Sequence, residues 1–177
     1  MKELEKKVKA VIRDVHDFPS EGIVFKDITT LLASPKLNAE VLLAFQEEAK
    51  LLNPDVIIGI DSRGFLYGNS IASFLEIPFV PVRKAGKLPY DTISISYDLE
   101  YGQSVLEIHK DAIKPGDKVL IHDDLLATGG TAEAASKLIT ELGGIVIGYS
   151  FLINLSFLPG TDRVTKISNN LFSIVTY

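Results

Sequence analysis

One stretch of the sequence, Val119 to Thr131, constrains the fold more strongly than any other. It begins with the apolar run Val119–Ile121, which predicts a short buried strand. The acid pair Asp123-Asp124 follows, and then come the small-residue segment Ala127-Thr-Gly-Gly-Thr131 and an Ala-rich helical pattern over residues 132–142. This order of strand, polar loop and helix predicts a phosphate site at the junction, with a sugar-diol site beside it.

The residue types at this junction indicate what it binds. Glycines let backbone N–H groups approach phosphate oxygens closely, and the start of the helix adds free N–H donors and a positive dipole end. Thr128 and Thr131 can add hydroxyl donors. The carboxylates of Asp123 and Asp124 instead accept hydrogen bonds, which suits the 2′ and 3′ hydroxyls of a ribose. The predicted ligand is therefore a ribose 5-phosphate.

Other interpretations of this stretch are weaker. An ordinary strand-loop-helix connection would not need two acids, two glycines and two threonines at these positions. The stretch is not a nucleoside triphosphate P-loop, because it lacks Gly-x-x-x-x-Gly-Lys-Ser/Thr. The dinucleotide fingerprint Gly-x-Gly-x-x-Gly is absent as well.

A similar pattern lies earlier in the chain. The apolar run Asp55–Ile60 predicts a strand buried on both faces, followed by the polar loop Asp61–Gly64 and a helix over residues 65–75. Residues 78–82 predict the next strand, and this spacing implies a right-handed crossover in a parallel sheet. We therefore expect an α/β domain with an open, mostly parallel central sheet flanked by helices.

Between these patterns, residues 92–97 and 104–108 alternate apolar and polar side chains, which predicts a long, half-exposed β-hairpin. A hairpin inserted in an α/β domain exposes unpaired strand edges to solvent, which is unfavourable unless the hairpin has a function. This suggests a mobile lid over a site, spanning about residues 90–109. Towards the N-terminus, helical spacing of apolar residues predicts an amphipathic first helix, and residues 13–22 are interpreted as a loop.

Three boundaries complete the pattern. Ser34-Pro35 predicts a helix start, Pro159-Gly160 is interpreted as a break in the chain, and residues 171–177 are assigned to a last short strand. We find no internal repeat or linker, so residues 1–177 are expected to form a single domain.

Composition limits the classes of function. With 177 residues, 46% of them hydrophobic and 23% charged, the chain suits one globular domain. The net charge of −5 disfavours general attraction to nucleic acid, so an anionic ligand must be held by local donors. Cysteine is absent, which excludes disulfides and thiolate metal sites. Without an apolar signal core or a bilayer-length apolar run, the expectation is a cytoplasmic protein with no membrane partner.

Ligands of open parallel sheets bind outside the carboxyl ends of the strands. Three loops are predicted there, at residues 61–64, 83–87 and 123–131. If these loops converge, Arg63 and Lys87 supply positive charge away from the 5-phosphate, which suggests a second anionic group on the same sugar. Alone, each would be interpreted as a solvated surface charge, and convergence with the acid pair is what favours the functional interpretation.

The segment Asp123-Asp-Leu-Leu-Ala-Thr-Gly-Gly-Thr131 resembles the phosphoribosyl pyrophosphate motif of the type I phosphoribosyltransferases. Residues 17–28, 59–65, 83–89 and 96–102 resemble the adenine phosphoribosyltransferase branch of that family, so the resemblance covers almost the whole chain. It implies a small base-binding hood in residues 1–33 and a homodimer. It also implies purine salvage, in which adenine and phosphoribosyl pyrophosphate give AMP and pyrophosphate. Mg²⁺ is implied as the cofactor, bound mainly through pyrophosphate and ribose oxygens and waters, and no metal-binding residue is assigned.

The resemblance also implies a role for each site residue. Those facing the 5-phosphate and ribose are Asp123, Asp124, Ala127, Thr128, Gly129, Gly130 and Thr131. Those facing pyrophosphate are Arg63, Asp61, Ser62 and Lys87, with a cis peptide within Asp61-Ser62. Adenine is expected to contact Val24, Phe25, Lys26 and Leu155, largely through backbone groups of the first three, with Phe25 stacking on the ring. The catalytic residues are Glu100 as general acid/base on the lid, the neighbouring Tyr101, and Arg63.

Two departures and two rivals remain open. Lys26 stands where many family members carry arginine, and the part after Leu158 matches weakly. The first rival is a related enzyme that uses hypoxanthine or xanthine, which the segment from Phe18 to Ile28 disfavours. The second is a purine-sensing repressor, and about one helix before the base segment is too little for a DNA-binding domain. Without the resemblance, Glu100 would be a solvated hairpin charge, and His122 is expected to pack behind the motif.

Overall fold

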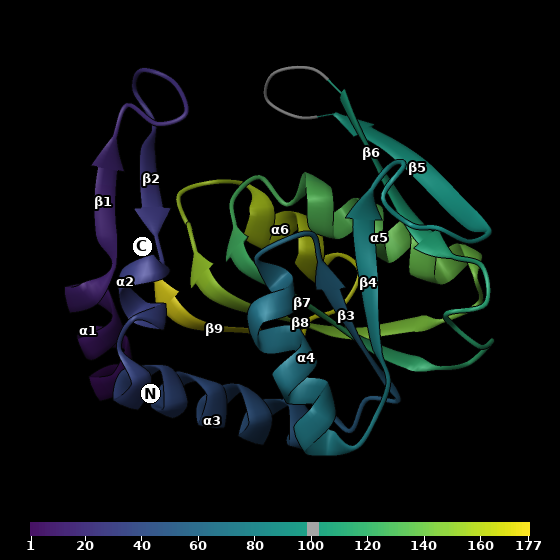
Figure 1. Ribbon diagram of the computed structural model, residues 1–177, viewed down its shortest axis with the longest axis horizontal. Coiled ribbons are helices and arrows are strands. Elements are labelled where there is room, and N and C mark those ends of the chain that lie inside the picture. Colours follow the sequence, from purple (N-terminus) through teal and green to yellow (C-terminus); the bar gives the residue numbers. More distant parts are fainter. Residues whose placement is uncertain (99–102) are drawn as a thin grey trace.

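The computed structural model of this chain describes residues 1–98 and 103–177 (Figure 1). The helices are α1 (Lys2–Val11), α2 (Thr29–Leu32), α3 (Pro35–Leu52), α4 (Gly64–Leu75), α5 (Gly130–Glu141) and α6 (Gly160–Thr165). The strands are β1 (Arg13–His16), β2 (Val24–Asp27), β3 (Val56–Ile60), β4 (Phe79–Lys84), β5 (Thr92–Asp98), β6 (Gln103–His109), β7 (Lys118–Leu126), β8 (Ile145–Asn154) and β9 (Leu171–Thr176). No helix among these described residues is long and apolar enough to cross a membrane.

Strands β5 to β9, together with β3 and β4, form one seven-stranded sheet in the order β5-β6-β4-β3-β7-β8-β9. The five neighbouring strands β4, β3, β7, β8 and β9 pair in parallel. Strand β6 runs antiparallel to β4, and β5 runs antiparallel to β6. The predicted open, mostly parallel sheet is therefore confirmed. The predicted pair of antiparallel strands, β5 and β6, is also present. Because β6 pairs with β4 of the main sheet, this hairpin is part of the sheet and not a separate insertion.

Apolar side chains pack on both faces of this sheet. One core lies between the sheet and α5 and α6, and includes Ile58, Ile121 and Leu138. The other lies between the sheet and α1, α3 and α4, and includes Phe45, Ile57 and Leu120. Because residues alternate between faces along a strand, neighbours such as Ile57 and Ile58 enter opposite cores. This two-sided burial explains the continuous apolar run predicted for β3.

Strand β7 is longer than expected. The prediction ended the buried strand at Ile121 and placed the acid pair at its end, but β7 continues in parallel pairing with β8 to Leu126. Asp123 and Asp124 therefore lie within a strand, held on a rigid element, and only the following loop turns into α5. The parallel partner supplies the backbone hydrogen bonds that the local sequence could not reveal.

The N-terminal region corrects a second expectation. Residues 13–22 were predicted as loop, yet Arg13–His16 form β1, which pairs with β2 in a separate antiparallel ribbon. A two-stranded ribbon buries little apolar surface, so β1 can consist mainly of polar residues such as Arg13 and Asp14. Such a strand lacks the apolar pattern by which strands are predicted from sequence. Figure 1 shows the β1–β2 ribbon and the β5–β6 hairpin projecting on opposite sides of the same end of the molecule.

A short helix corrects a third expectation. Pro159-Gly160 was interpreted as a break, whereas Pro159 precedes α6, which runs from Gly160 to Thr165. Proline is well tolerated at a helix start, where its missing N–H costs no hydrogen bond. The remaining predicted elements, including the helix beginning after Ser34 and the last strand β9, are confirmed.

Candidate active site

The segment Ala127–Thr131, here called the phosphate loop, joins β7 to the N-terminus of α5. Gly129 has a φ of 78°, a left-handed conformation that glycine adopts at little cost and that turns the chain into the helix. The loop borders a cavity of about 200 Å³. The residues that line it are Asp123, Leu125, Leu126, Ala127, Thr128, Gly129, Gly130, Thr131, Ala132 and Phe151. The predicted phosphate residues thus surround one concave space at a helix N-terminus.

The phosphate loop rests on α6, a contact that the sequence prediction missed. The Gly160 N–H donates to the Ala127 carbonyl at 3.0 Å, and a Cβ on Gly160 would overlap that oxygen. Gly129 likewise lies directly against the Gly160 backbone. Only glycine fits this close approach, so the Pro159-Gly160 pair was a signal of backbone contact and not simply of a break.

The acid pair lies next to the loop, at the carboxyl end of the sheet. The Asp124 carboxylate is buried, and Arg63 Nε at the start of α4 lies 3.0 Å from its Oδ2. Asp123 Oδ1 accepts the Asp124 backbone N–H at 2.8 Å. Burial and the neighbouring Asp124 charge raise the pKa of Asp123 well above its ordinary value. Burial also raises the pKa of Asp124, against the opposing effect of Arg63. Two acids with raised pKa values beside a cation are typical of a functional site.

A second charged cluster follows β3. Lys87 Nζ lies 2.9 Å and Arg83 Nε 3.3 Å from Asp61 Oδ2. Burial opposes ionisation of Asp61, but these two cations outweigh it and hold the pKa of Asp61 below its ordinary value. The peptide bond between Asp61 and Ser62 is cis, as the family resemblance implied. The structure therefore brings the predicted residues Asp61 and Lys87 together and adds Arg83.

The loop that carries Lys87 is fixed by a buried acid on the hairpin. Glu107 Oε1 accepts the backbone N–H groups of Lys87 at 3.0 Å and of Leu88 at 2.9 Å. Burial opposes the charge, but hydrogen bonds from the 86–88 backbone hold the pKa of Glu107 below its ordinary value. The sequence prediction did not include Glu107, because an acid that alternates with Leu106 and Ile108 is the pattern of a solvent-facing residue. In the structure all three residues are buried, so this part of β6 is not half-exposed as predicted.

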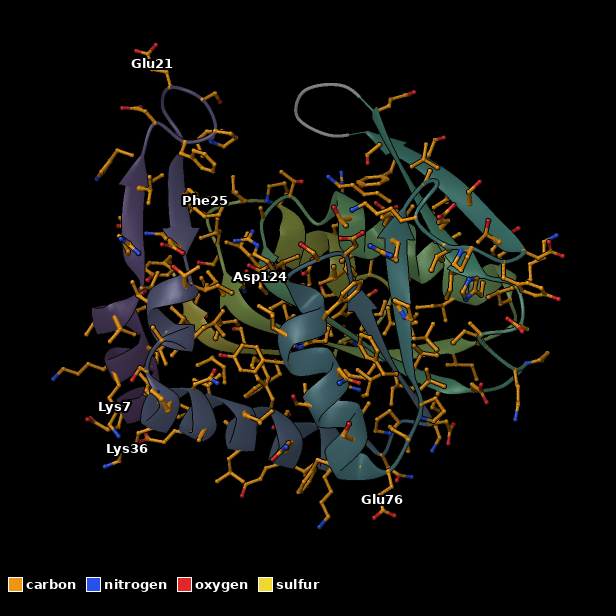
Figure 2. All side chains as sticks on the ribbon, viewed as in Figure 1. Lys7, Glu21, Phe25, Lys36, Glu76 and Asp124 are labelled. Carbon is orange, nitrogen blue, oxygen red and sulfur yellow. The ribbon has the colours of Figure 1, made fainter. Side chains whose placement is uncertain are left out.

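The predicted base segment lies across from the acid pair. Phe25 on β2 has its ring centre 4.9 Å from Arg63 Cζ, and the Phe18 ring packs edge-on against it at 5.2 Å. In Figure 2, Phe25 lies on the side of β2 that faces Asp124. Because Arg63 contacts both Phe25 and Asp124, it links the hood to the acid pair.

Lys26 points elsewhere. Its ammonium lies 2.7 Å from Asp14 Oδ1 on β1 and 4.1 Å from the centre of the Tyr177 ring. Leu155 is half-buried just after β8, and its N–H donates to the Leu126 carbonyl. The side chain of Lys26 thus serves contacts within the protein, which leaves its backbone for any contact with a ligand.

Two predicted catalytic residues, Glu100 and Tyr101, lie outside the described residues. His122 is completely buried behind the acid pair, as expected, and its ring packs against Phe45 at 4.9 Å. Burial lowers the pKa of His122 to about 3, so the ring is neutral at physiological pH. It is therefore a packing residue.

Comparison with known proteins identifies the family of this chain. Residues 27–156 match the phosphoribosyl transferase domain family. The adenine phosphoribosyltransferase of Cytophaga hutchinsonii is 50% identical over 174 residues, which cover 98% of this chain and 96% of that protein.

Solved structures give the same result. The adenine phosphoribosyltransferase of Thermoanaerobacter pseudethanolicus has 44% identity and a TM-score of 0.92, and the match covers 97% of this chain and 99% of that one. The Trypanosoma brucei enzyme in complex with AMP, pyrophosphate and ribose-5-phosphate has 27% identity and a TM-score of 0.88, covering 98% of this chain and 79% of that one. The chain therefore belongs to the phosphoribosyltransferase family and, within it, to the adenine phosphoribosyltransferases.

Proposed function

We propose that this chain transfers the 5-phosphoribosyl group from phosphoribosyl pyrophosphate to adenine in purine salvage, releasing AMP and pyrophosphate. The observation that carries the proposal is the position of Arg63, which contacts the acid pair through Asp124 and the base segment through Phe25. A sugar phosphate held between the phosphate loop and the acid pair would therefore place its C1 carbon near the hood. The relative from Trypanosoma brucei, crystallised with AMP and pyrophosphate, supports this assignment.

Each part of the site has a role in this reaction. The backbone N–H groups and hydroxyls of the phosphate loop bind the 5-phosphate, and Asp123 and Asp124 accept hydrogen bonds from the ribose hydroxyls. Arg63, Lys87 and Ser62 bind pyrophosphate, while Asp61 holds the Lys87 ammonium ready at 2.9 Å. As the bond from C1 to pyrophosphate breaks, the ribose gains positive charge, which nearby carboxylates stabilise.

The base is bound by the hood. In a two-stranded ribbon, alternate residues of β2 direct their backbone N–H and C=O groups away from β1, where they can pair with a purine edge. Phe25 offers its ring for stacking and Leu155 covers the base from the other side. A purine ring nitrogen bonds to C1 as pyrophosphate leaves, and the proton on the purine passes to Glu100 on the lid, with Tyr101 beside it. A closed hairpin excludes water, which would otherwise hydrolyse the activated ribose.

Mg²⁺ fits this site as a partner of the substrate. Among residues 1–98 and 103–177, no three His, Asp or Glu side chains gather in a way that could hold a metal. The acid pair would accept hydrogen bonds from water molecules of a Mg²⁺ ion that the substrate carries into the site. When bound, Mg²⁺ offsets the negative charge that develops on pyrophosphate.

A homodimer and a cytoplasmic location are the remaining parts of the proposal. Large apolar side chains are exposed on the adjacent helices α3 and α4, among them Leu43, Leu66 and Phe74, and Val24 on β2 is partly exposed. Burial of such side chains in a second copy would be favourable. Sedimentation equilibrium tests the dimer, and cell fractionation tests the location.

The reaction is tested by incubating the purified chain with phosphoribosyl pyrophosphate, Mg²⁺ and, separately, adenine, hypoxanthine, xanthine and guanine. We expect AMP and pyrophosphate from adenine, and much slower turnover of the other bases. A preference for hypoxanthine or xanthine would contradict the assignment. Tight, salt-sensitive binding to duplex DNA together with no turnover of any base would instead favour a purine-sensing repressor.

A further inference from the structure

The Tyr177 side chain joins two parts of the molecule that are far apart in sequence. The ammonium of Lys26, on strand β2, lies 4.1 Å from the centre of its ring. The Lys26 side chain is only 12% exposed, and a cation–π contact strengthens when the cation is removed from water. Figure 1 shows the C-terminal end of the chain beside α2 and the lower end of β2. The ring of Tyr177 is therefore a contact point for the hood.

The backbone of Tyr177 is fixed to a different segment. Its main-chain oxygen accepts hydrogen bonds from the Ser156 N–H at 2.9 Å and the Ser156 hydroxyl at 2.7 Å. Its N–H donates to the Asn154 carbonyl at 2.9 Å. These three bonds attach Tyr177 on both sides of Leu155, the residue assigned to cover adenine. Tyr177 thus contacts Lys26 with its ring and the Leu155 segment with its backbone.

The two segments are the two walls of the proposed base site. Lys26 follows directly after Phe25, and side chains of successive residues in a strand point to opposite faces. Phe25 therefore faces Arg63 and the acid pair, while Lys26 reaches behind the wall to Tyr177. A force on Lys26 is transmitted to Phe25 through one peptide unit, so the contact with Tyr177 restrains the position of the hood wall.

We propose that Tyr177, through Lys26, is a positioning residue that sets the separation between the Phe25 wall and the Leu155 wall, and thereby the affinity for the purine base. This inference rests on the proposed function. It also gives a reason for a cation at position 26, since the Lys26 ammonium contacts the Tyr177 ring and Asp14 at the same time. The contacts of both side chains are within the protein, so their effect on the base is assigned to the walls.

A second lysine supplies a matched control. Lys9 Nζ lies 5.1 Å from the centre of the same ring, but Lys9 is on α1 and also pairs with Glu5. Removing its charge alters the surroundings of Tyr177 without affecting the strand that carries Phe25. Lys26→Met and Lys9→Met therefore remove a cation from the same aromatic ring, and only the first changes a wall of the base site.

The test is steady-state kinetics of the full chain with both substrates varied. We expect Tyr177→Leu and Lys26→Met each to raise KM for adenine about threefold to tenfold, the range for loss of a partly desolvated cation–π contact, with KM for phosphoribosyl pyrophosphate unchanged. Tyr177→Phe and Lys26→Arg keep a ring and a cation, and should restore values within about twofold of the wild type. The double variant Tyr177→Leu/Lys26→Met should have a KM for adenine no higher than that of the single variant with the larger increase, because both substitutions remove the same contact.

The results separate the possible explanations. An unchanged KM for adenine in Tyr177→Leu would overturn the inference, and so would an equal rise in KM for both substrates, which would indicate general loosening. An effect of Lys9→Met as large as that of Lys26→Met would also overturn it, because the ring and not the wall would then matter. If the wild-type chain does not use adenine at all, the proposed function itself fails, and that result is visible before any variant is made.

Discussion

The phosphate side and the base side of the site are built in different ways. The phosphate side is one continuous segment, in which β7, the phosphate loop and α5 follow each other along the chain. The base side combines β2 with the end of β8 and Tyr177, and more than a hundred residues of sequence separate β2 from the other two. Phosphate recognition needs backbone N–H groups at a helix start, which local sequence can specify. Recognition of a flat, largely apolar base needs two facing walls, which only long-range packing can place.

This difference explains which parts tolerate change. A continuous segment keeps its geometry as long as the strand and helix form, whereas walls from separate elements depend on contacts between them. The phosphate loop is nevertheless not wholly local, because Gly160 supports it from α6. The acid pair has a similar dependence, because it lies on β7 between β3 and β8 and contacts Arg63 at the start of α4. Four predictions test how far the comparison holds.

The largest expected effect lies outside both regions. Glu100→Leu removes the proposed general acid/base and should lower kcat about 10²-fold or more. Both KM values should stay close to the wild type, because neither wall nor phosphate loop is altered. Glu47→Leu, at an exposed position on α3, is the control. Unchanged turnover would mean that Glu100 is a solvated charge, and a rise in KM alone would move its role from chemistry to binding.

The second prediction challenges the local character of the phosphate side. Gly160→Ala places a methyl group where the Ala127 carbonyl lies, so the phosphate loop must shift. Misplacement of a binding loop by about 1 Å can cost about 10²-fold, and we expect kcat/KM for phosphoribosyl pyrophosphate to fall about tenfold to a hundredfold. Asp162→Ala, exposed on the same helix, should have little effect. Wild-type kinetics in Gly160→Ala would show that the loop is determined by its own sequence.

The third prediction concerns the loop carrying Lys87. Glu107→Gln keeps an acceptor oxygen but loses the charge that strengthens two backbone hydrogen bonds. We expect KM for phosphoribosyl pyrophosphate to rise about threefold to tenfold, since a charge-assisted hydrogen bond contributes about 1.5–3 kcal/mol and glutamine retains part of it. The KM for adenine should not change. An equal loss with both substrates would assign Glu107 to stability of the hairpin alone.

The smallest expected effect concerns stability. A raised carboxyl pKa means that the folded chain binds the proton of Asp123 more tightly than the unfolded chain, so stability falls as pH rises above 3.8, the ordinary value. Asp123→Asn removes this cost and should raise Tm at pH 7 by about 2–4 °C, the shift for about 1 kcal/mol in a domain of this size. The gain should disappear as the pH falls below 3.8, where aspartate becomes protonated in both states. A lower Tm at pH 7 would show that the charged form of Asp123 stabilises the fold.

The sequence alone determined the features that depend on neighbouring residues. Apolar runs defined β3 and the start of β7, alternation defined the hairpin, and the spacing of acids, glycines and threonines defined the phosphate loop. These patterns follow from the periodicity of strands and helices and from the backbone freedom of glycine. Identification of the base and of Glu100 did not follow from such patterns and depended on the family resemblance.

Tertiary structure decided the rest. Polar strand β1 forms because it pairs with β2, and the acid pair lies within β7 because β8 continues beside it. The roles of Gly160, Glu107 and Tyr177 depend on contacts across 20 or more residues, such as that between Glu107 and Lys87. The physical reason is that burial, close backbone approach and cation–π contacts are properties of surroundings, and the surroundings of a residue are set by chain segments that its local sequence does not contain.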